Sequence, residues 1–144
     1  MRVSYYQLVA TISLVIEVVV LVLLFSGYWL KRLKKFRQHG LTMLTAVVLH
    51  TIMILAWMIP SLASFLGSSG SKNLADIIVV TTLIHAFMGI AADILGIWLT
   101  ASWRLQVDMK TCFAKKKIMR LTLTLWLIAL VLGIILYLKI IQLF

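Results

Sequence analysis

The chain has 144 residues, of which 63% are hydrophobic and 12% charged, and its mean hydropathy is +1.10. A soluble domain of this size cannot bury so much apolar surface, so the composition excludes an ordinary soluble protein. The formal net charge of +10 comes without a nucleic-acid recognition motif, so we expect no nucleic-acid partner.

Four apolar segments are each long enough to cross a hydrocarbon core of about 30 Å as a helix. In lipid the backbone must satisfy its own hydrogen bonds, and segments this long favour helices over barrel strands. We therefore predict an all-α fold, an integral membrane antiparallel four-helix bundle that forms a single transmembrane domain over residues 1–144. The predicted helices are Tyr5–Leu30, Leu41–Leu66, Leu74–Trp103 and Met119–Leu143.

The first segment carries Glu17 near its middle. The segment is longer than a signal-peptide core and has no small-residue cleavage site, so we expect a retained helix. An ionisable group at this depth is a functional candidate because it is expensive to bury in lipid. Three roles stay open for Glu17: orienting a ligand histidine, carrying a proton, or bonding to a neighbouring helix.

The second segment contains His39 at one end and His50 near the middle. A separation of 11 residues places both on one helical stripe, about 16 Å apart along the axis. Pro60 lies near the other end, where neighbouring helices can accommodate a kink.

The third segment places His85, Gly89 and Gly96 on one stripe. Small residues at this spacing indicate either close helix packing or a slot for a flat, bulky group. Asp93 lies off this stripe. We expect it to pair with an Arg or Lys on the cytoplasmic side, or with Thr100 or Thr122.

Counting from Ser69, in the turn between the second and third helices, His50 lies 19 residues before and His85 16 residues after. The two imidazoles are therefore at similar depth, as the axial ligands of one b-type haem iron would be. The alternatives are separate hydrogen bonds to Thr, carbonyl or acidic groups, a non-haem metal, or a proton path.

Most cations fall in two short loops, five between the first and second helices and six between the third and fourth. Such loops stay cytoplasmic, so we expect a multi-pass protein of the cell membrane with both termini outside. Arg104 and its basic neighbours would contact anionic lipid and, with His39 nearby, haem propionates. The single cysteine, Cys112, lies in the second basic loop and excludes an intramolecular disulfide.

An ordered pattern covers roughly residues 31–138: H-G-x-x-M at 39–43, His50, M-I-P-S at 58–61, His85, W-R-L at 103–105 and K-K-I-M-R-L-T-x-T-L-W at 116–126. It resembles the small four-helix membrane family that includes the terminal-oxidase maturation factor CtaM (YozB), and in particular its archaeal-like members.

The resemblance implies histidines at the entry and middle of the second helix and in the third, which His39, His50 and His85 match. It also implies a link to terminal-oxidase assembly or haem handling. Family members often carry a further histidine before the last helix, but residues 112–117 contain none. One haem b is therefore expected, and a second would need Met, Cys, Lys or water opposite His39.

The leading hypothesis is a small membrane haem-binding protein, acting in electron transfer or in haem supply to a respiratory oxidase. His50 and His85 would be the axial ligands, and Gly89 and Gly96 would make room for the macrocycle. The expected partners are the lipid bilayer, an oxidase or redox partner and a second copy of the chain. We expect no stand-alone enzyme, because no nucleophile–base pair or phosphate loop appears. A small proton-coupled transporter using Glu17, or a structural assembly subunit without cofactor, are the alternatives.

Overall fold

The computed structural model describes residues 5–67, 77–103 and 109–143, and these confirm the predicted all-α four-helix bundle. Four helical stretches of the described chain are long and apolar enough to cross a membrane, at Gln7–Arg32, Phe36–Gly67, Ile77–Trp103 and Lys116–Lys139. The elements are α1 (Tyr5–Arg32), α2 (Phe36–Met53), η1 (Ile54–Met58, a π-helix), α3 (Ile59–Gly67), α4 (Ile77–Trp103), α5 (Met109–Ala114) and α6 (Lys116–Leu143).

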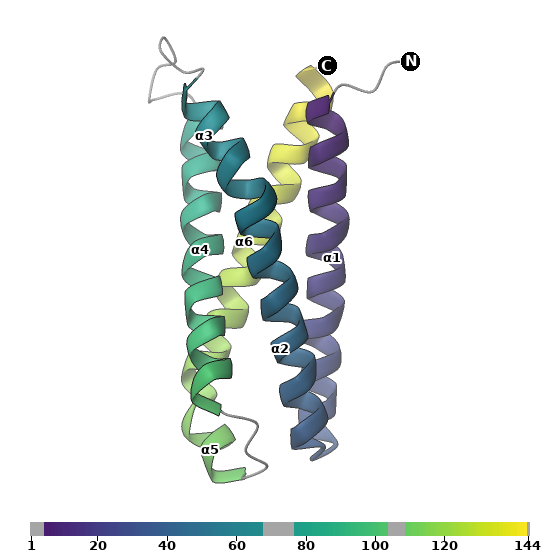
Figure 1. Ribbon diagram of the computed structural model, residues 1–144, viewed down its shortest axis with the longest axis vertical. Coiled ribbons are helices and arrows are strands. Elements are labelled where there is room, and N and C mark those ends of the chain that lie inside the picture. The colour runs from purple at the N-terminus through teal and green to yellow at the C-terminus, as the bar shows by residue number, and fades with distance from the viewer. Residues whose placement is uncertain (1–4, 68–76, 104–108, 144) are drawn as a thin grey trace.

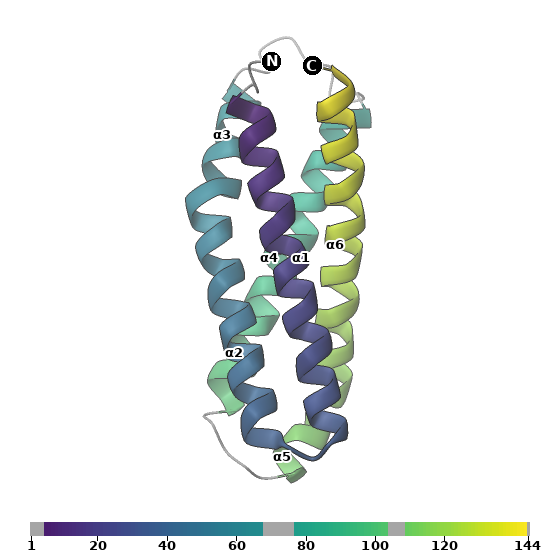
Figure 2. The ribbon, with the colours of Figure 1, turned by 90° about the vertical axis from the view of Figure 1, so that its right-hand side faces the viewer.

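The long helices run antiparallel along one axis (Figure 1). The turn between α1 and α2 lies at the same end of the bundle as α5, and we call this the basic end. The start of α1 and the finish of α6 lie together at the opposite end (Figure 2). The most extensive helix contacts join α1 to α2 and α4 to α6.

The interior of the bundle is narrow, and large apolar side chains point outward. Phe87 is 69% exposed and Trp29 64%, as expected for side chains that face lipid tails rather than water. Small residues such as Ala46 and Ala92 are fully buried, which lets the helix backbones approach closely. The core is a cluster of six buried residues: Val20, Leu24, Ala46, Val47, Ala92 and Trp126.

A tight turn joins α1 to α2. Lys34 adopts a φ of 59°, and the amides of Lys34 and Lys35 bond back to the carbonyls of Lys31 and Leu30 at 3.1 and 3.0 Å. This left-handed residue closes the end of α1 in the way that glycine commonly does. The second helix therefore starts at Phe36, five residues before the predicted Leu41.

The second membrane span widens into the π-helix η1 immediately after α2. Its C-cap residue, Ile59, donates its backbone N–H to the carbonyl of Ile54, five residues earlier. Pro60 follows at once; it has no N–H, and its ring would clash with the carbonyl four residues before it. The kink expected near Pro60 thus takes the form of a widened turn on its N-terminal side.

Candidate functional site: two cavities in the bundle

Two neighbouring cavities lie inside the bundle, and the three histidines divide between them. The first, the central cavity, has a volume of about 20 Å³. His50 and His85 both line it, so the two histidines lie at matched depth, as counting along the helices predicted. The second, the basic-end cavity, has a volume of about 450 Å³ and is lined by His39.

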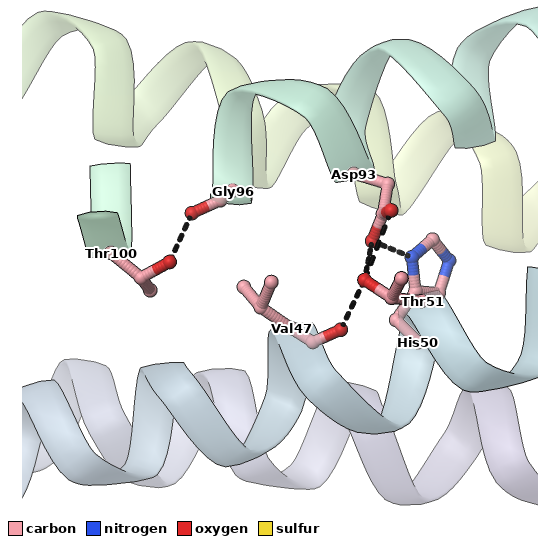
Figure 3. A network of polar contacts seen from close by, with 6 residues as sticks. All are labelled: Val47, His50, Thr51, Asp93, Gly96 and Thr100. Atoms are coloured by element: carbon pink, nitrogen blue, oxygen red, sulfur yellow. Dashed lines mark hydrogen bonds and ion pairs between the residues drawn. The ribbon is translucent and has the colours of Figure 1, made fainter. Parts of the chain in front are cut away.

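His50 is held from one side by a buried carboxylate. Its Nδ1 lies 3.0 Å from Oδ1 of Asp93, and Thr51 Oγ1 lies 3.0 and 3.1 Å from the two oxygens of the same carboxylate (Figure 3). The prediction that Asp93 pairs with a cytoplasmic-side cation, Thr100 or Thr122 is therefore wrong. Asp93 is buried on the side of α4 that faces α2, where His50 and Thr51 meet it.

Thr100 and Thr122 satisfy their hydroxyls within their own helices instead. Thr100 donates to the carbonyl of Gly96 at 2.9 Å (Figure 3), and Thr122 donates to the carbonyl of Ile118 at 2.9 Å. Neither hydroxyl is needed by the carboxylate of Asp93, because His50 and Thr51 already provide it with donors.

His85 is anchored by the backbone of α6. Its Nδ1 lies 2.8 Å from the carbonyl oxygen of Ala129, and a carbonyl only accepts, so Nδ1 carries the proton. The other ring nitrogen, Nε2, lies 3.9 Å from Oε1 of Glu17, beyond hydrogen-bonding distance. Glu17 therefore does not orient His85 through a direct hydrogen bond.

The central cavity does not fit a porphyrin. Ligand sites usually enclose about 300–1,000 Å³, whereas about 20 Å³ accommodates roughly one water molecule. A Cβ added at Gly89 would meet nothing within 4 Å, but one at Gly96 would lie 3.0 Å from Val47 and 3.3 Å from the indole of Trp126. At Gly96, side chains fill the slot that the small-residue stripe was expected to leave open.

The basic-end cavity, at about 450 Å³, falls within the usual volume range of ligand sites and is large enough for a porphyrin-sized group. Gly96 and Trp126 close it towards the centre of the bundle, and Trp103 forms part of its wall. Gly40 allows this arrangement, since a Cβ there would overlap the indole of Trp103. Its walls also include the apolar side chains of Leu24, Met43, Val47, Leu99, Phe113, Met119 and Leu123.

His39 presents one ring nitrogen for ligand binding. Its Nδ1 donates to the carbonyl of Gly27 at 2.7 Å, which fixes the proton on Nδ1 and leaves the lone pair on Nε2. Across the described residues, Nε2 has no hydrogen-bond partner. A histidine that donates its other N–H to a backbone carbonyl has the arrangement typical of metal ligands.

The rim of the basic-end cavity is cationic. Lys31 and Arg120 come from α1 and α6, so the charge surrounds the cavity rather than lying on one helix. The remaining cations that line it are Arg32, Lys34 and Lys116. Arg104, a predicted propionate partner, lies outside the described residues, and of Cys112 the structure describes only the backbone, in α5.

Trp126 is the site residue to which the sequence assigned no role. It lines both cavities, its ring stands edge-on to His50 with centroids 5.1 Å apart, and it is only 7% exposed. Its Nε1 is buried without a hydrogen-bond partner among the described residues. The side chain therefore forms the partition between the cavities.

Comparisons with family models, curated proteins and solved structures find no match to this chain. Within the described ranges, no group of three or more His, Cys, Asp or Glu side chains is arranged to hold a metal ion. Functional inference therefore depends on the two cavities themselves.

Proposed function

We propose that this protein is a small membrane haem-binding protein that serves electron transfer or haem handling during assembly of a respiratory oxidase. One observation carries the proposal: the basic-end cavity combines an unpaired imidazole nitrogen with apolar walls and a cationic rim. Haem has the matching features of an iron that binds imidazole, an apolar ring and two carboxylates.

In this proposal His39 is the iron ligand, because Gly27 holds its Nδ1 proton and leaves Nε2 free. Met119 lines the same cavity from α6, and its thioether would be the candidate for a second ligand. Bound haem would supply a one-electron couple at its iron, and the chain would bind and orient it.

The propionates would meet Lys31, Arg120 and the other rim cations, whose charge-assisted hydrogen bonds favour carboxylates. We further propose that the basic end faces the cytoplasm and both termini face outward, following the positive-inside rule. The ligand would then enter from the cytoplasmic side, at the level of the lipid headgroups.

The test is a haemin titration of the purified protein in nanodiscs, followed by visible absorption in the oxidised and reduced states. We expect one haem per chain and a b-type spectrum on reduction, with affinity that falls as salt rises because the rim charges are screened. Folded protein that stays colourless with excess haemin would refute the proposal. An affinity for haemin that does not change with salt would refute the role of the rim.

A proton-coupled transporter is the second candidate, favoured by the position of Glu17 beside His85 in the central cavity. It predicts substrate efflux from vesicles that is driven by a proton gradient and abolished by Glu17→Gln. If haem binds normally and no efflux occurs, this candidate is eliminated. A structural subunit without cofactor would remain only if both tests are negative.

A further inference from the structure

The groups around the central cavity are nearly all hydrogen-bond acceptors. His85 donates through Nδ1 to the carbonyl of Ala129, so neutral His85 presents a lone pair at Nε2. That lone pair faces Oε1 of Glu17 across 3.9 Å. An ionised carboxylate would also be an acceptor there, so the contact is unfavourable unless a hydrogen lies between the two atoms.

His50 adds a third acceptor. Its Nδ1 donates to the carboxylate of Asp93, and the Thr51 hydroxyl lies between that carboxylate and the carbonyl of Val47. Neutral His50 therefore has its lone pair on Nε2, and that nitrogen has no hydrogen-bond partner within the described part of the chain. His50 is only 3% exposed and lines the central cavity, so a donor inside that cavity would complete its hydrogen bonding.

The space available matches a single water molecule. A water needs roughly 10–15 Å³ of such volume and two to four polar partners, and the central cavity offers about 20 Å³. Glu17, His50 and His85 supply acceptors, and Trp126, whose Nε1–H is buried without a partner among the described residues, lines the same space. Glu17 and His85 are separated by 3.9 Å, and at more than 3.5 Å a bridging water is the arrangement to test.

The charges around the central cavity call for a bound proton in addition to this water molecule. The titratable groups facing the cavity and its immediate surroundings are Glu17 from α1, His50 from α2, and His85 and Asp93 from α4. The described residues of α6 that line it, Trp126, Ala129 and Leu130, carry no charge, and no Lys or Arg is among the lining residues. Two ionised carboxylates without a cation are strongly disfavoured in the middle of a membrane.

We infer that the central cavity is a binding site for one water molecule and one exchangeable proton, shared by Glu17, His85 and His50. The proton lies between acceptors that would otherwise repel one another, and the water bridges the 3.9 Å gap between Glu17 and His85. A metal ion is the less suitable occupant, because the described acidic and histidine side chains form no metal-binding group. The inference does not depend on haem binding, since it concerns a different cavity.

The experiment uses the full-length protein, without haem, labelled with ¹⁵N-histidine in deuterated-lipid nanodiscs. Solid-state NMR reports the tautomer of each imidazole and its contacts with exchangeable water protons. We expect His50 and His85 to be Nδ1–H tautomers, each with a water cross-peak at Nε2. Across a pH titration, the two Nε2 resonances should shift together as this one proton is released or taken up.

Glu17→Gln should abolish that shared proton uptake, because the amide cannot exchange a proton in this range. Tyr137→Phe, at a residue that lines neither cavity, should leave it intact. Gly133→Ala keeps the acid but adds a Cβ about 3.0 Å from Oε2 of Glu17 and 3.1 Å from Cε1 of His85. It should remove the water cross-peak, and it serves as the decisive variant if Glu17→Gln does not fold. Gly67→Ala, whose Cβ meets nothing within 4 Å, is its control.

Three results would overturn the inference. The first is wild-type protein without a water cross-peak at either Nε2. The second is proton uptake that is the same in wild type and Glu17→Gln. The third is a stoichiometric transition metal, found by elemental analysis of the purified protein, because it would take the place of the proton.

Discussion

The central cavity and the basic-end cavity use the same histidine arrangement in opposite surroundings. In both, a histidine is held through Nδ1 by an acceptor: Asp93 for His50, the Ala129 carbonyl for His85 and the Gly27 carbonyl for His39. One cavity measures about 20 Å³ and has no Lys or Arg among the described residues that line it, whereas the other measures about 450 Å³ and is rimmed by cations.

The difference between the two cavities shows that holding a histidine through Nδ1 does not by itself determine what its Nε2 binds. Volume and charge decide what the free nitrogen meets: water and a proton in the central cavity, and a large anionic amphiphile at the basic end. Trp126 keeps the two environments apart, since it lines both cavities and fills the space over Gly96.

The wall of the basic-end cavity offers the largest predicted effect on stability. Gly40→Ala should lower the free energy of unfolding by about 1–3 kcal/mol, because the new Cβ overlaps the Trp103 indole and the packed wall must shift. Gly67→Ala, with open space around its Cβ, is the matched control. Denaturation in detergent followed by circular dichroism measures both, and equal stabilities would show that the Trp103 wall is not close-packed.

The hydrogen bond between His50 and Asp93, beside the central cavity, should contribute less to the free energy of unfolding. Asp93→Ala leaves Nδ1 of His50 without its acceptor and should cost about 1–2 kcal/mol, the upper range for interhelical hydrogen bonds in membranes. The control is Ile94→Ala, at a neighbouring position that is 61% exposed to lipid. Haem uptake should be unchanged in Asp93→Ala, and its loss would mean that the two cavities are not independent.

The cations at the rim of the basic-end cavity should change the affinity for haemin only modestly. Arg120→Gln should weaken haemin binding about threefold, because an exposed ion pair contributes only about 0.2–1 kcal/mol. Arg37 lies in the first turn of α2, at the basic end, but does not line the cavity, so Arg37→Gln is the control for net charge. Equal weakening by both variants in a titration at low salt would mean that charge acts without specific contacts.

The smallest effect is expected at a polar contact that lines neither cavity. The hydroxyls of Tyr137 and Thr11 lie 3.2 Å apart at an exposed position between α6 and α1. Tyr137→Phe should change the free energy of unfolding by less than about 0.5 kcal/mol and leave haemin binding unaltered. A larger loss of stability in the same denaturation assay would show that this end of the bundle holds the helices together.

The fold was predictable because the length and hydropathy of four segments determine how many helices cross the membrane. The early start of α2 was missed, because Arg37 and Gln38 are polar although their backbone is helical. Side chains at a membrane interface direct their polar ends to water, so the apolar pattern stops before the helix does. The π-helix was also missed, since Pro60 predicts a distortion but not its form.

The site was predictable only in part. Residue counting placed His50 and His85 at one depth, and they do share a cavity. The partner of Asp93 depends on how α4 is rotated against α2, and a sequence does not fix that rotation. Trp126 lay inside a quoted motif, but only the packed structure shows that its indole occupies the space expected for a cofactor.

The most direct test compares haemin binding by His39→Ala with binding by the double variant His50→Ala/His85→Ala, in one titration under identical conditions. Our account predicts that His39→Ala loses at least about 1.4 kcal/mol of binding free energy, which is tenfold in affinity, together with the spectrum of a histidine-ligated haem. The double variant should keep both. Haem binding that survives in His39→Ala but disappears in the double variant would contradict the account and place the iron between His50 and His85.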